Sequence, residues 1–333
     1  MARPPSPSNT SCFTTQDSLQ ARRPHSVRFS SVFFFILLKK MNIVLAVSRD
    51  FGCPETSEVP PELTFSCRGA LYEGILRQGT TSEVGAVTLY SDLSMIILMY
   101  VIGLLAQRHG HVTPAELNPD CVLQSGRGIE HCYFDVFVRK SVLGHLGMGA
   151  TVFLVDESQR HLVPPTWLDQ SYRNFTMQGV VSDGNTYAMG GISGHAGLFS
   201  SVPNLYRMMR RLAFADENDP WINKGTVAFF TRVFNASHST RALGWDTNSA
   251  LSSTCGTSFA PETFLHTGYT GTQICMDPVE PSNDPSTPSG LLTILLTNRC
   301  HPDDSAESSS GMSTIRRSFN TAVKQAYRSK NGI

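Results

Sequence analysis

Three polar stretches of this 333-residue chain carry side chains that could bind a ligand or move a proton. Tyr90-Ser91-Asp92 stands before a long apolar run, and His195 lies in a glycine-rich segment. His266-Thr267-Gly268 belongs to the stretch FLHTGYTGTQICMDP, which alternates like a strand toward its end. Tyrosine, histidine and carboxylate groups serve as general acids and bases. Glycine in a strand often marks a place where a ligand or another backbone comes close, so residues 264–276 predict one edge of a binding site.

Each stretch also has a purely structural interpretation, which stays open at this point. Asp92 could cap the following helix by accepting a free backbone N–H, and Tyr90 could be a packed aromatic residue. His195 could be hydrogen-bonded scaffolding in its loop, and Asp183 could hydrogen-bond in the same loop without a catalytic role. The glycines around His195 exclude a regular helix or strand and predict a loop that lets backbone approach closely. They are Gly184, Gly190, Gly191, Gly194 and Gly197.

The surrounding pattern predicts an α+β domain in which helices cover an antiparallel sheet. The run from Met95 to Ala106 is apolar on all sides and predicts a buried helix. Another helix should follow Ser200 or Ser201 as its N-cap, with Pro203 in its first turn. Residues 291–299 predict a buried strand, antiparallel and adjacent to the strand that carries His266. A helix near the C-terminus should pack on this sheet through one apolar stripe, formed by Ile315, Phe319, Ala322, Val323 and Ala326.

The order of these motifs resembles the serine β-lactamase and penicillin-binding-protein superfamily, and within it the class-C-like branch of β-lactamase-related hydrolases and esterases. The motifs that carry the resemblance are YSDL, GGISGHAGLFSS, RALGWDT, FLHTGYTG and LLTNRCHP. Each motif is weak alone, but their shared order is specific, and together they cover roughly residues 70 to 330. The resemblance implies a β-lactamase/transpeptidase-like fold: an antiparallel sheet flanked by helices, with a helical subdomain, here without its N-terminal portion.

The resemblance also implies roles for particular residues. Tyr90, Asp92 and His266 would be catalytic, while Thr267, Gly268, Tyr269 and His195 would bind substrate. The Tyr269 N–H would point into an oxyanion hole, and the substrate would lie along the strand as an extra strand. Tyr90, His195 and His266 should then gather around one concavity. The expected ligand is a small acyl, ester or peptide-like molecule, and no cofactor is expected.

One part of the family pattern is missing from the printed sequence. The family's nucleophile is the serine of a Ser-x-x-Lys motif, and no serine of this chain has a lysine three residues later. Thr321 and Lys324 have the spacing, but we expect them on the surface of the C-terminal helix. Three interpretations follow: a homologue with impaired or lost catalysis, an active hydrolase that uses Ser91, Ser193 or water, or a non-catalytic ligand-binding protein.

Composition bounds the remaining properties. Lys+Arg and Asp+Glu are both 27, so the formal net charge is zero and nucleic acid is not expected as the main partner. Residues 1–60 are rich in Ser, Pro and Arg and predict a disordered segment. The resemblance implies that residues 61–333 form a β-lactamase-related domain that is incomplete at its N-terminus. The apolar stretch 32–47 is interrupted by lysines and predicts no stable membrane span. It leaves secretion or membrane association open beside the expected cytoplasmic location.

The eight cysteines form no C-x-x-C pair and no zinc-finger spacing, which predicts mostly free thiols in a reducing compartment and no metal site. The sequence makes no prediction of oligomeric state.

Overall fold

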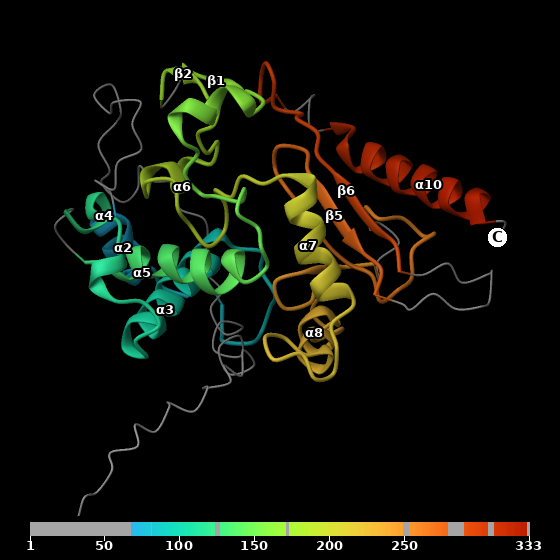
Figure 1. Cartoon of the computed structure of the whole chain (residues 1–333), viewed down its shortest axis with the longest axis horizontal. Coiled ribbons are helices and arrows are strands. Elements are labelled where there is room, and N and C mark those ends of the chain that lie inside the picture. The colour runs from blue at the N-terminus through green and yellow to red at the C-terminus, as the bar shows by residue number, and fades with distance from the viewer. Residues whose placement is uncertain are drawn as a thin grey trace, which may run out of the picture.

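The structure is a computed structural model that describes residues 68–80, 82–123, 127–170, 173–248, 253–278, 290–305 and 310–331. The predictions for residues 1–60, including the apolar stretch 32–47, lie outside the described residues, as does most of the loop expected between 278 and 290. One side of the molecule is helical, and the other side holds a sheet with helices packed beside it (Figure 1). None of the helices in the described part of the chain is both long and apolar enough to cross a membrane.

The helical side is built around α3 (Asp92–Arg108) and α5 (Glu130–Phe137), which pack against each other. The predicted buried helix is confirmed and extends beyond Met95–Ala106 at both ends. Gly103 permits the close approach, because a Cβ there would lie 1.8 Å from the carbonyl oxygen of Glu130. Leu93, Ile96 and Met99 of α3 are at most 2 % exposed and form the centre of this core. Tyr90 lies just before α3, so the packing of α3 against α5 fixes the position of the segment that carries it.

Shorter elements complete this side and lead to the sheet. They are α2 (Arg68–Leu76), η3 (Pro114–Glu116), α4 (Pro119–Leu123), the π-helix η4 (Val138–Gly144), η5 (Glu157–Leu162), the paired strands β1 (Leu168–Asp169) and β2 (Phe175–Thr176), and α6 (Gly184–Ala188). The short helix α8 (Lys224–Thr231) lies on the sheet side, where its Val227 belongs to the same core cluster as Phe264 (Figure 1).

The sheet is antiparallel, with the strand order β3 (Asp246–Thr247), β4 (Phe264–Thr267), β5 (Gln273–Met276) and β6 (Leu292–Leu295). The single strand predicted over residues 264–276 is wrong, because the chain reverses between Thr267 and Gln273 and pairs with itself as a hairpin. The strand predicted at 291–299 is confirmed as the shorter β6, but it is half-buried instead of buried: Thr293 is buried and the other three residues are of intermediate exposure. It pairs with β5 and not with β4, so the predicted adjacency of β6 to the His266 strand is wrong.

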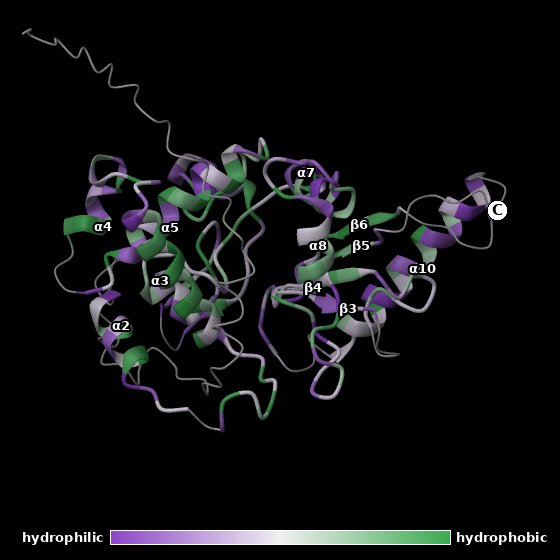
Figure 2. Cartoon of the chain, turned by 90° about the horizontal axis from the view of Figure 1, so that it is seen from below, coloured by the Kyte–Doolittle hydropathy of each residue, from purple (hydrophilic) through white to green (hydrophobic). Residues whose placement is uncertain are grey.

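Each face of the sheet has its own helical cover. Met209 of α7 (Val202–Ala213) packs with Phe264 and Met276 on one face. As predicted, α7 follows the N-cap Ser201 and has Pro203 in its first turn. The other face is covered by α10 (Met312–Asn331), which lies at the outer edge of the molecule (Figures 1 and 2). Side chains alternate along a strand, so Phe264 and His266 lie on the same face of the sheet. This is the face that α7 covers, and it also turns toward the helical side of the molecule.

The C-terminal helix packs on the sheet, but not through the predicted stripe. Its buried residues are Met312, Asn320 and Lys324, and the purple segments of α10 in Figure 2 reflect its polar character. Ile315 of the apolar stripe is 49 % exposed. Lys324, predicted at the surface, is 1 % exposed, and its Nζ lies 3.5 Å from Asp277 Oδ2. A buried charge needs a partner, and Asp277 supplies one in the sheet.

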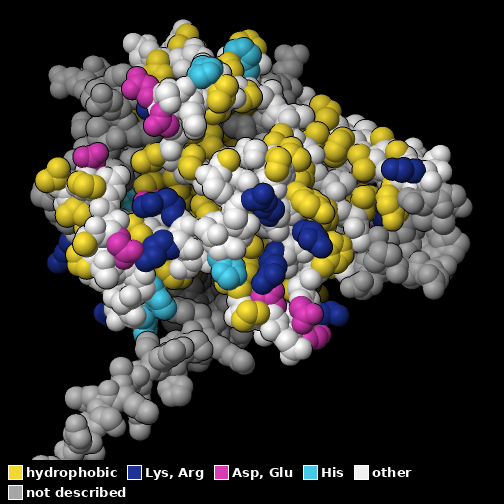
Figure 3. Space-filling view, in the orientation of Figure 1, with side chains coloured by type: hydrophobic (Ala, Val, Ile, Leu, Met, Phe, Trp, Pro, Cys, Tyr) yellow, Lys and Arg dark blue, Asp and Glu magenta, His cyan; other side chains and the backbone are white. Residues whose placement is uncertain are grey.

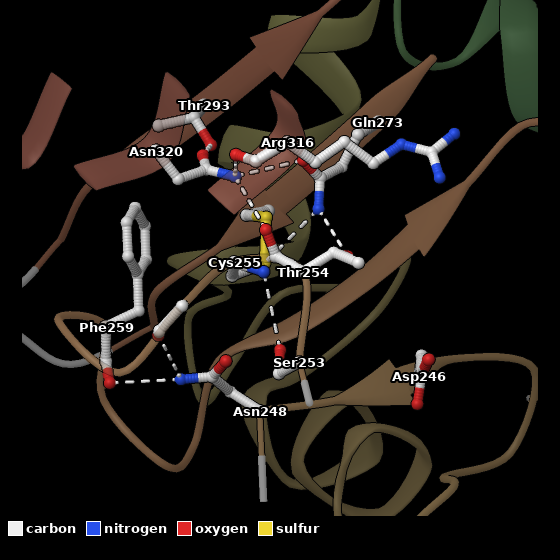
Figure 4. Close-up of a disulfide and its surroundings, with 12 residues drawn as sticks. Asp246, Asn248, Ser253, Thr254, Cys255, Phe259, Gln273, Thr293, Arg316 and Asn320 are labelled. Carbon is white, nitrogen blue, oxygen red and sulfur yellow. Dashed lines mark hydrogen bonds between the residues drawn. A yellow bond between two sulfur atoms is a disulfide. The ribbon is translucent and has the colours of Figure 1, made fainter. Parts of the chain in front are cut away.

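Asn320 fills the space between α10 and the sheet with hydrogen bonds (Figure 4). Its Nδ2 donates to Gln273 Oε1 at 2.9 Å, and its Oδ1 accepts from the Thr293 hydroxyl at 2.6 Å. The polar face of the sheet explains why the buried stripe of α10 is also polar: buried amide and hydroxyl groups must find hydrogen-bond partners.

The prediction of mostly free thiols is wrong for four of the described cysteines. Cys255 is disulfide-bonded to Cys275 beside the Asn320 network, and Cys121 is bonded to Cys132 in the helical part. Cys300 is a buried free cysteine. Charged side chains on the face seen in Figure 3 are mixed, with Lys and Arg lying among acidic and hydrophobic residues.

Candidate active site

One open cavity of about 130 Å³ lies where the helical side meets the sheet. Its lining consists of Tyr90, Arg241, Asp246, His266 and Thr267. These residues come from the start of α3, the segment before β3, β3 itself and the end of β4. Tyr90 and His266, which are far apart in the sequence, therefore line one concavity, as the family resemblance implied.

His266 and Thr267 stand at the end of β4, where the strand opens into its turn. His266 is paired with Ile274 across the hairpin, so the register of β5 fixes its position. Its Nδ1 lies 2.9 Å from the Thr267 carbonyl oxygen. A carbonyl oxygen only accepts, which assigns the Nδ1 proton to this bond. Nε2 is then the ring atom that remains for a ligand, as an acceptor in the neutral ring and a donor in the cation.

Tyr90 lies at the mouth of the cavity and is 61 % exposed. The guanidinium carbon of Arg241 lies 5.0 Å from the centre of its ring, within the range of a cation–π contact. Partial burial raises the pKa of Tyr90 and the Asp92 carboxylate adds to the rise, while Arg241 opposes it. The phenol is therefore protonated at neutral pH, and Tyr90 can donate a hydrogen bond to a ligand.

The structure corrects the capping role considered for Asp92. Ser91 is the N-cap of α3, and its hydroxyl accepts from the Ser94 N–H at 3.4 Å. Asp92 is the first helical residue, where a carboxylate favours the positive end of the helix dipole. Asp92 is absent from the cavity lining, so its catalytic assignment has no geometric support at the cavity.

Arg241 and Asp246 were not predicted as site residues. Arg241 Nη2 lies 4.0 Å from Asp246 Oδ2, and both groups are partly exposed. They place a cation and a carboxylate beside the His266 strand, because Asp246 pairs with Leu265 of β4 in the sheet. The signal for them was the motif RALGWDT, which contributed to the family resemblance but was given no role of its own.

The glycine-rich loop supports α3 instead of lining the cavity. A Cβ at Gly194 would lie 2.3 Å from the Met95 carbonyl oxygen, so the close approach that the glycines predicted is made to a helix of the same chain. His195 is locked inside this loop: its Nε2 lies 2.9 Å from Asp183 Oδ1, and its Nδ1 lies 2.8 Å from the Ser193 hydroxyl. His195 does not line the cavity, contrary to the expected grouping with Tyr90 and His266.

Ser193, His195 and Asp183 have the residue types of a serine hydrolase triad, but their burial argues against that role. Ser193 is 3 % exposed, so an acyl group cannot reach its hydroxyl. Ser91 is 8 % exposed, and its hydroxyl serves as the helix cap. Neither serine considered as a replacement nucleophile is therefore available as it stands. Within the described residues no group of three His, Cys, Asp or Glu side chains could hold a metal ion.

Comparison with known proteins assigns the family. The β-lactamase family model matches residues 70–310, which is most of the chain, and the chain belongs to the β-lactamase family. The resemblance inferred from the motif order is confirmed. The α+β fold with its antiparallel sheet and helices agrees with that of the solved relatives and is confirmed as well.

Two bacterial relatives carry the name D-alanyl-D-alanine carboxypeptidase as a provisional assignment. The Escherichia coli K12 protein is 28 % identical over 253 residues, which make up 70 % of this chain and 50 % of that protein. The Salmonella typhi protein is 25 % identical over 272 residues, 79 % of this chain and 58 % of that protein. The chain thus spans about half the length of the curated relatives it matches.

Two solved structures share the fold at low sequence identity. Unliganded simvastatin synthase from Aspergillus terreus aligns with a TM-score of 0.51 at 14 % identity, covering 87 % of this chain and 68 % of the synthase. EstCE1, a hydrolase with promiscuous acyltransferase activity, aligns with a TM-score of 0.50 at 14 % identity, covering 85 % and 71 % of the two chains. The chain is a β-lactamase-family hydrolase homologue.

Proposed function

We propose that this chain binds a small acyl, ester or peptide-like ligand at the Tyr90–His266 cavity and does not form an acyl-serine with it. The observation that carries the proposal is the composition of the cavity. It offers hydrogen-bond donors and acceptors and a cation, namely Tyr90, His266, Thr267 and Arg241, and no serine is among the described residues that line it. The names of the bacterial relatives and of the solved hydrolase support an acyl or peptide-like ligand.

The lack of turnover rests on the chemistry of the nucleophile. A serine hydroxyl reacts poorly at neutral pH unless a base removes its proton, and the family provides a lysine one helical turn away. No serine in the printed sequence has that lysine, and the Thr321-x-x-Lys324 spacing leads to a lysine buried beside Asp277. Ligand orientation by Tyr90 and His266 would remain, which favours binding over catalysis.

The test combines an activity assay with a binding assay on the full chain. Nitrocefin and p-nitrophenyl acetate should show no turnover above background, and intact-mass spectrometry should show no acyl adduct. N-acetyl-D-alanyl-D-alanine should bind in a calorimetric titration. The variant His266→Ala should weaken binding by about tenfold, the value of one hydrogen bond to a charged group, while the exposed control His161→Ala should not.

Two results would overturn the proposal. Stoichiometric acylation of one serine, abolished when that serine is changed to alanine, would show an active hydrolase with another nucleophile. Absence of binding by the unmodified chain, or equal binding by His266→Ala, would remove the ligand-binding role from this cavity.

A further inference from the structure

The turn that joins β4 to β5 is held from outside through its carbonyl oxygens. Within the turn, the Gly268 N–H donates to the Thr272 carbonyl at 2.9 Å, and the Gly271 N–H donates to the Gly268 carbonyl at 3.1 Å. Gly271 has φ +111°, which favours glycine, and a Cβ there would lie 2.7 Å from the Thr297 hydroxyl oxygen. The turn is therefore tightly closed and pressed against the segment that follows β6.

Arg316 of α10 binds both ends of this turn with one nitrogen. Its Nη2 donates to the Gly268 carbonyl at 2.9 Å and to the Thr272 carbonyl at 3.1 Å. The helix that covers the far face of the sheet thus reaches around to the end of β4. Burial lowers the pKa of Arg316, and nearby Arg299 lowers it further, but an arginine stays charged in proteins.

Arg299 holds the middle of the turn. Its Nε donates to the Tyr269 carbonyl at 2.6 Å, and its own N–H donates to the Thr270 carbonyl at 2.9 Å. Asp304 fixes the guanidinium at 3.0 Å and accepts from the Tyr269 hydroxyl at 2.7 Å. The Arg299 guanidinium carbon also lies 4.2 Å from the centre of the Tyr269 ring.

These bonds define where the Tyr269 amide points. A peptide unit is planar, and its N–H and C=O point in opposite directions when it is trans. Arg316 holds the Gly268 carbonyl, so it fixes the plane that contains the Tyr269 N–H, while Arg299 fixes the next plane along the chain. Among the described residues the Tyr269 N–H has no hydrogen-bond acceptor. The Tyr269 N–H is therefore a donor that is held in place and, within the described part of the chain, is open to a ligand.

We infer that Arg316 is a positioning residue for the Tyr269 amide, which donates to the acyl oxygen of a ligand bound along β4. This inference rests on the proposed function for the ligand, but the fixing of the amide by Arg316 is a property of the free protein. Preorganised donors act most strongly when they need no reorganisation as the ligand arrives. Arg316 gives this turn that order from a helix that does not line the cavity.

The first experiment needs no ligand. Backbone ¹⁵N relaxation of the full chain should give a Tyr269 order parameter of about 0.85 in the unmodified protein and below about 0.6 in Arg316→Met, which keeps the aliphatic stem but no donor. Arg316→Lys should restore order, because an ammonium can also donate to two carbonyls. Arg317→Met is the matched control, since Arg317 is the next residue of α10 and makes no hydrogen bond to the turn.

An unchanged Tyr269 order parameter in folded Arg316→Met overturns the inference, and so does an equal loss in Arg317→Met. A purely structural role would lower the melting temperature without selectively mobilising Tyr269. If Arg316→Met does not fold, Arg316→Gln and Arg317→Gln are compared with the same measurement.

The second experiment adds N-acetyl-D-alanyl-D-alanine. Arg316→Met should weaken its binding by about tenfold, the loss of one well-placed hydrogen bond to the acyl oxygen, and Arg317→Met by less than about twofold. Failure of the unmodified chain to bind this probe counts against the proposed function alone, because the relaxation result still decides the role of Arg316. Equal binding by Arg316→Met, with the order parameter lowered, overturns the link to the ligand.

Discussion

Lys324 and Asp277 form an ion pair inside the protein, with 3.5 Å between Nζ and Oδ2 and side-chain exposures of 1 % and 0 %. The pair joins α10 to the chain just after β5. The Lys324 Nζ also lies 4.8 Å from the centre of the Phe259 ring. Burial lowers the pKa of Lys324, and Asp277 opposes that shift. This contact, together with the Asn320 hydrogen bonds, attaches α10, which carries Arg316, to the sheet.

Lys324→Met should destabilise the protein by about 3–5 kcal/mol, because it leaves the Asp277 carboxylate buried without its cation. Urea unfolding followed by circular dichroism measures the loss. Lys330→Met, at an exposed position of the same helix, is the control and should change stability little. The double variant Lys324→Met with Asp277→Leu should recover most of the loss, and failure to do so would mean that the destabilisation is not electrostatic.

The Cys255–Cys275 disulfide should stabilise the sheet by roughly 3 kcal/mol, as expected for a loop of its length. The two residues are 20 positions apart, and the bridge lies beneath the Asn320 network. Replacing both by serine should lower the urea midpoint by the corresponding amount, and Cys300→Ser should not remove any bridge. Free-thiol labelling of the unfolded, unreduced chain checks the pairing: reactive thiols at both 255 and 275 would contradict it.

Gly194→Ala should cost roughly 1–3 kcal/mol, in the range of overpacking a close contact, because its Cβ would meet the Met95 carbonyl oxygen at 2.3 Å. Gly184→Ala is the matched control: nothing lies within 4 Å of a Cβ there, and the residue is at the start of α6. Thermal unfolding distinguishes the two variants. Equal melting temperatures would show that the loop does not press on α3 as the structure has it.

Local sequence predicted the elements better than their partners. The residue spacing near the C-terminus predicted a helix but not which of its residues are buried. The burial of Lys324 depends on Asp277, which lies far away in the sequence. The disulfides were missed for the same reason, because the fold and not the local sequence brings Cys121 to Cys132 and Cys255 to Cys275. The hairpin between β4 and β5 was missed although Gly268 and Gly271 carry a turn signal, because the alternating pattern continued past them.

The site residues likewise fall into those that sequence motifs predicted and those that only the fold brings to the cavity. Tyr90, His266 and Thr267 lie in motifs with a recognisable order, and the fold brings them to one cavity. Arg241 and Asp246 face that cavity only because the segment before β3 passes beside the start of α3, and no local pattern indicates this. His195 had both a binding and a scaffold interpretation, and its bonds to Asp183 and Ser193 favour the scaffold.

The Asp183–His195 contact should make the free energy of unfolding depend on pH in the acid range. Burial alone raises the pKa of Asp183, but hydrogen bonds and charge from His195, with the Thr186 N–H, outweigh it and lower the pKa to about 2 from 3.8. The unfolded chain therefore binds this proton first as the pH falls. The stabilisation is present above about pH 4 and is lost as the pH falls toward about 2. Asp183→Asn should flatten this part of the stability profile, whereas Glu262→Gln at an exposed position should keep its shape.

The protonation state of Tyr90 distinguishes a hydrogen-bond donor from a general base. Burial and Asp92 raise the pKa of Tyr90 above its usual 10.0, and Arg241 limits the rise. NMR titration of ¹³Cζ-labelled tyrosine, assigned with Tyr90→Phe, should therefore show Tyr90 titrating above pH 10, and at still higher pH in Arg241→Met, which removes the cation.

The consequence for function follows from the same titration. A phenol that stays protonated can donate a hydrogen bond to an acyl oxygen but cannot take a proton from a serine at neutral pH. Tyr90→Phe should therefore weaken binding of N-acetyl-D-alanyl-D-alanine by up to about tenfold, which corresponds to the loss of one hydrogen bond. Because Tyr90 stays protonated between pH 7 and about 9, its ionisation should not change ligand binding in that range. A Tyr90 phenolate at neutral pH, together with ester turnover that is lost in Tyr90→Phe, would instead identify Tyr90 as the base of an active hydrolase.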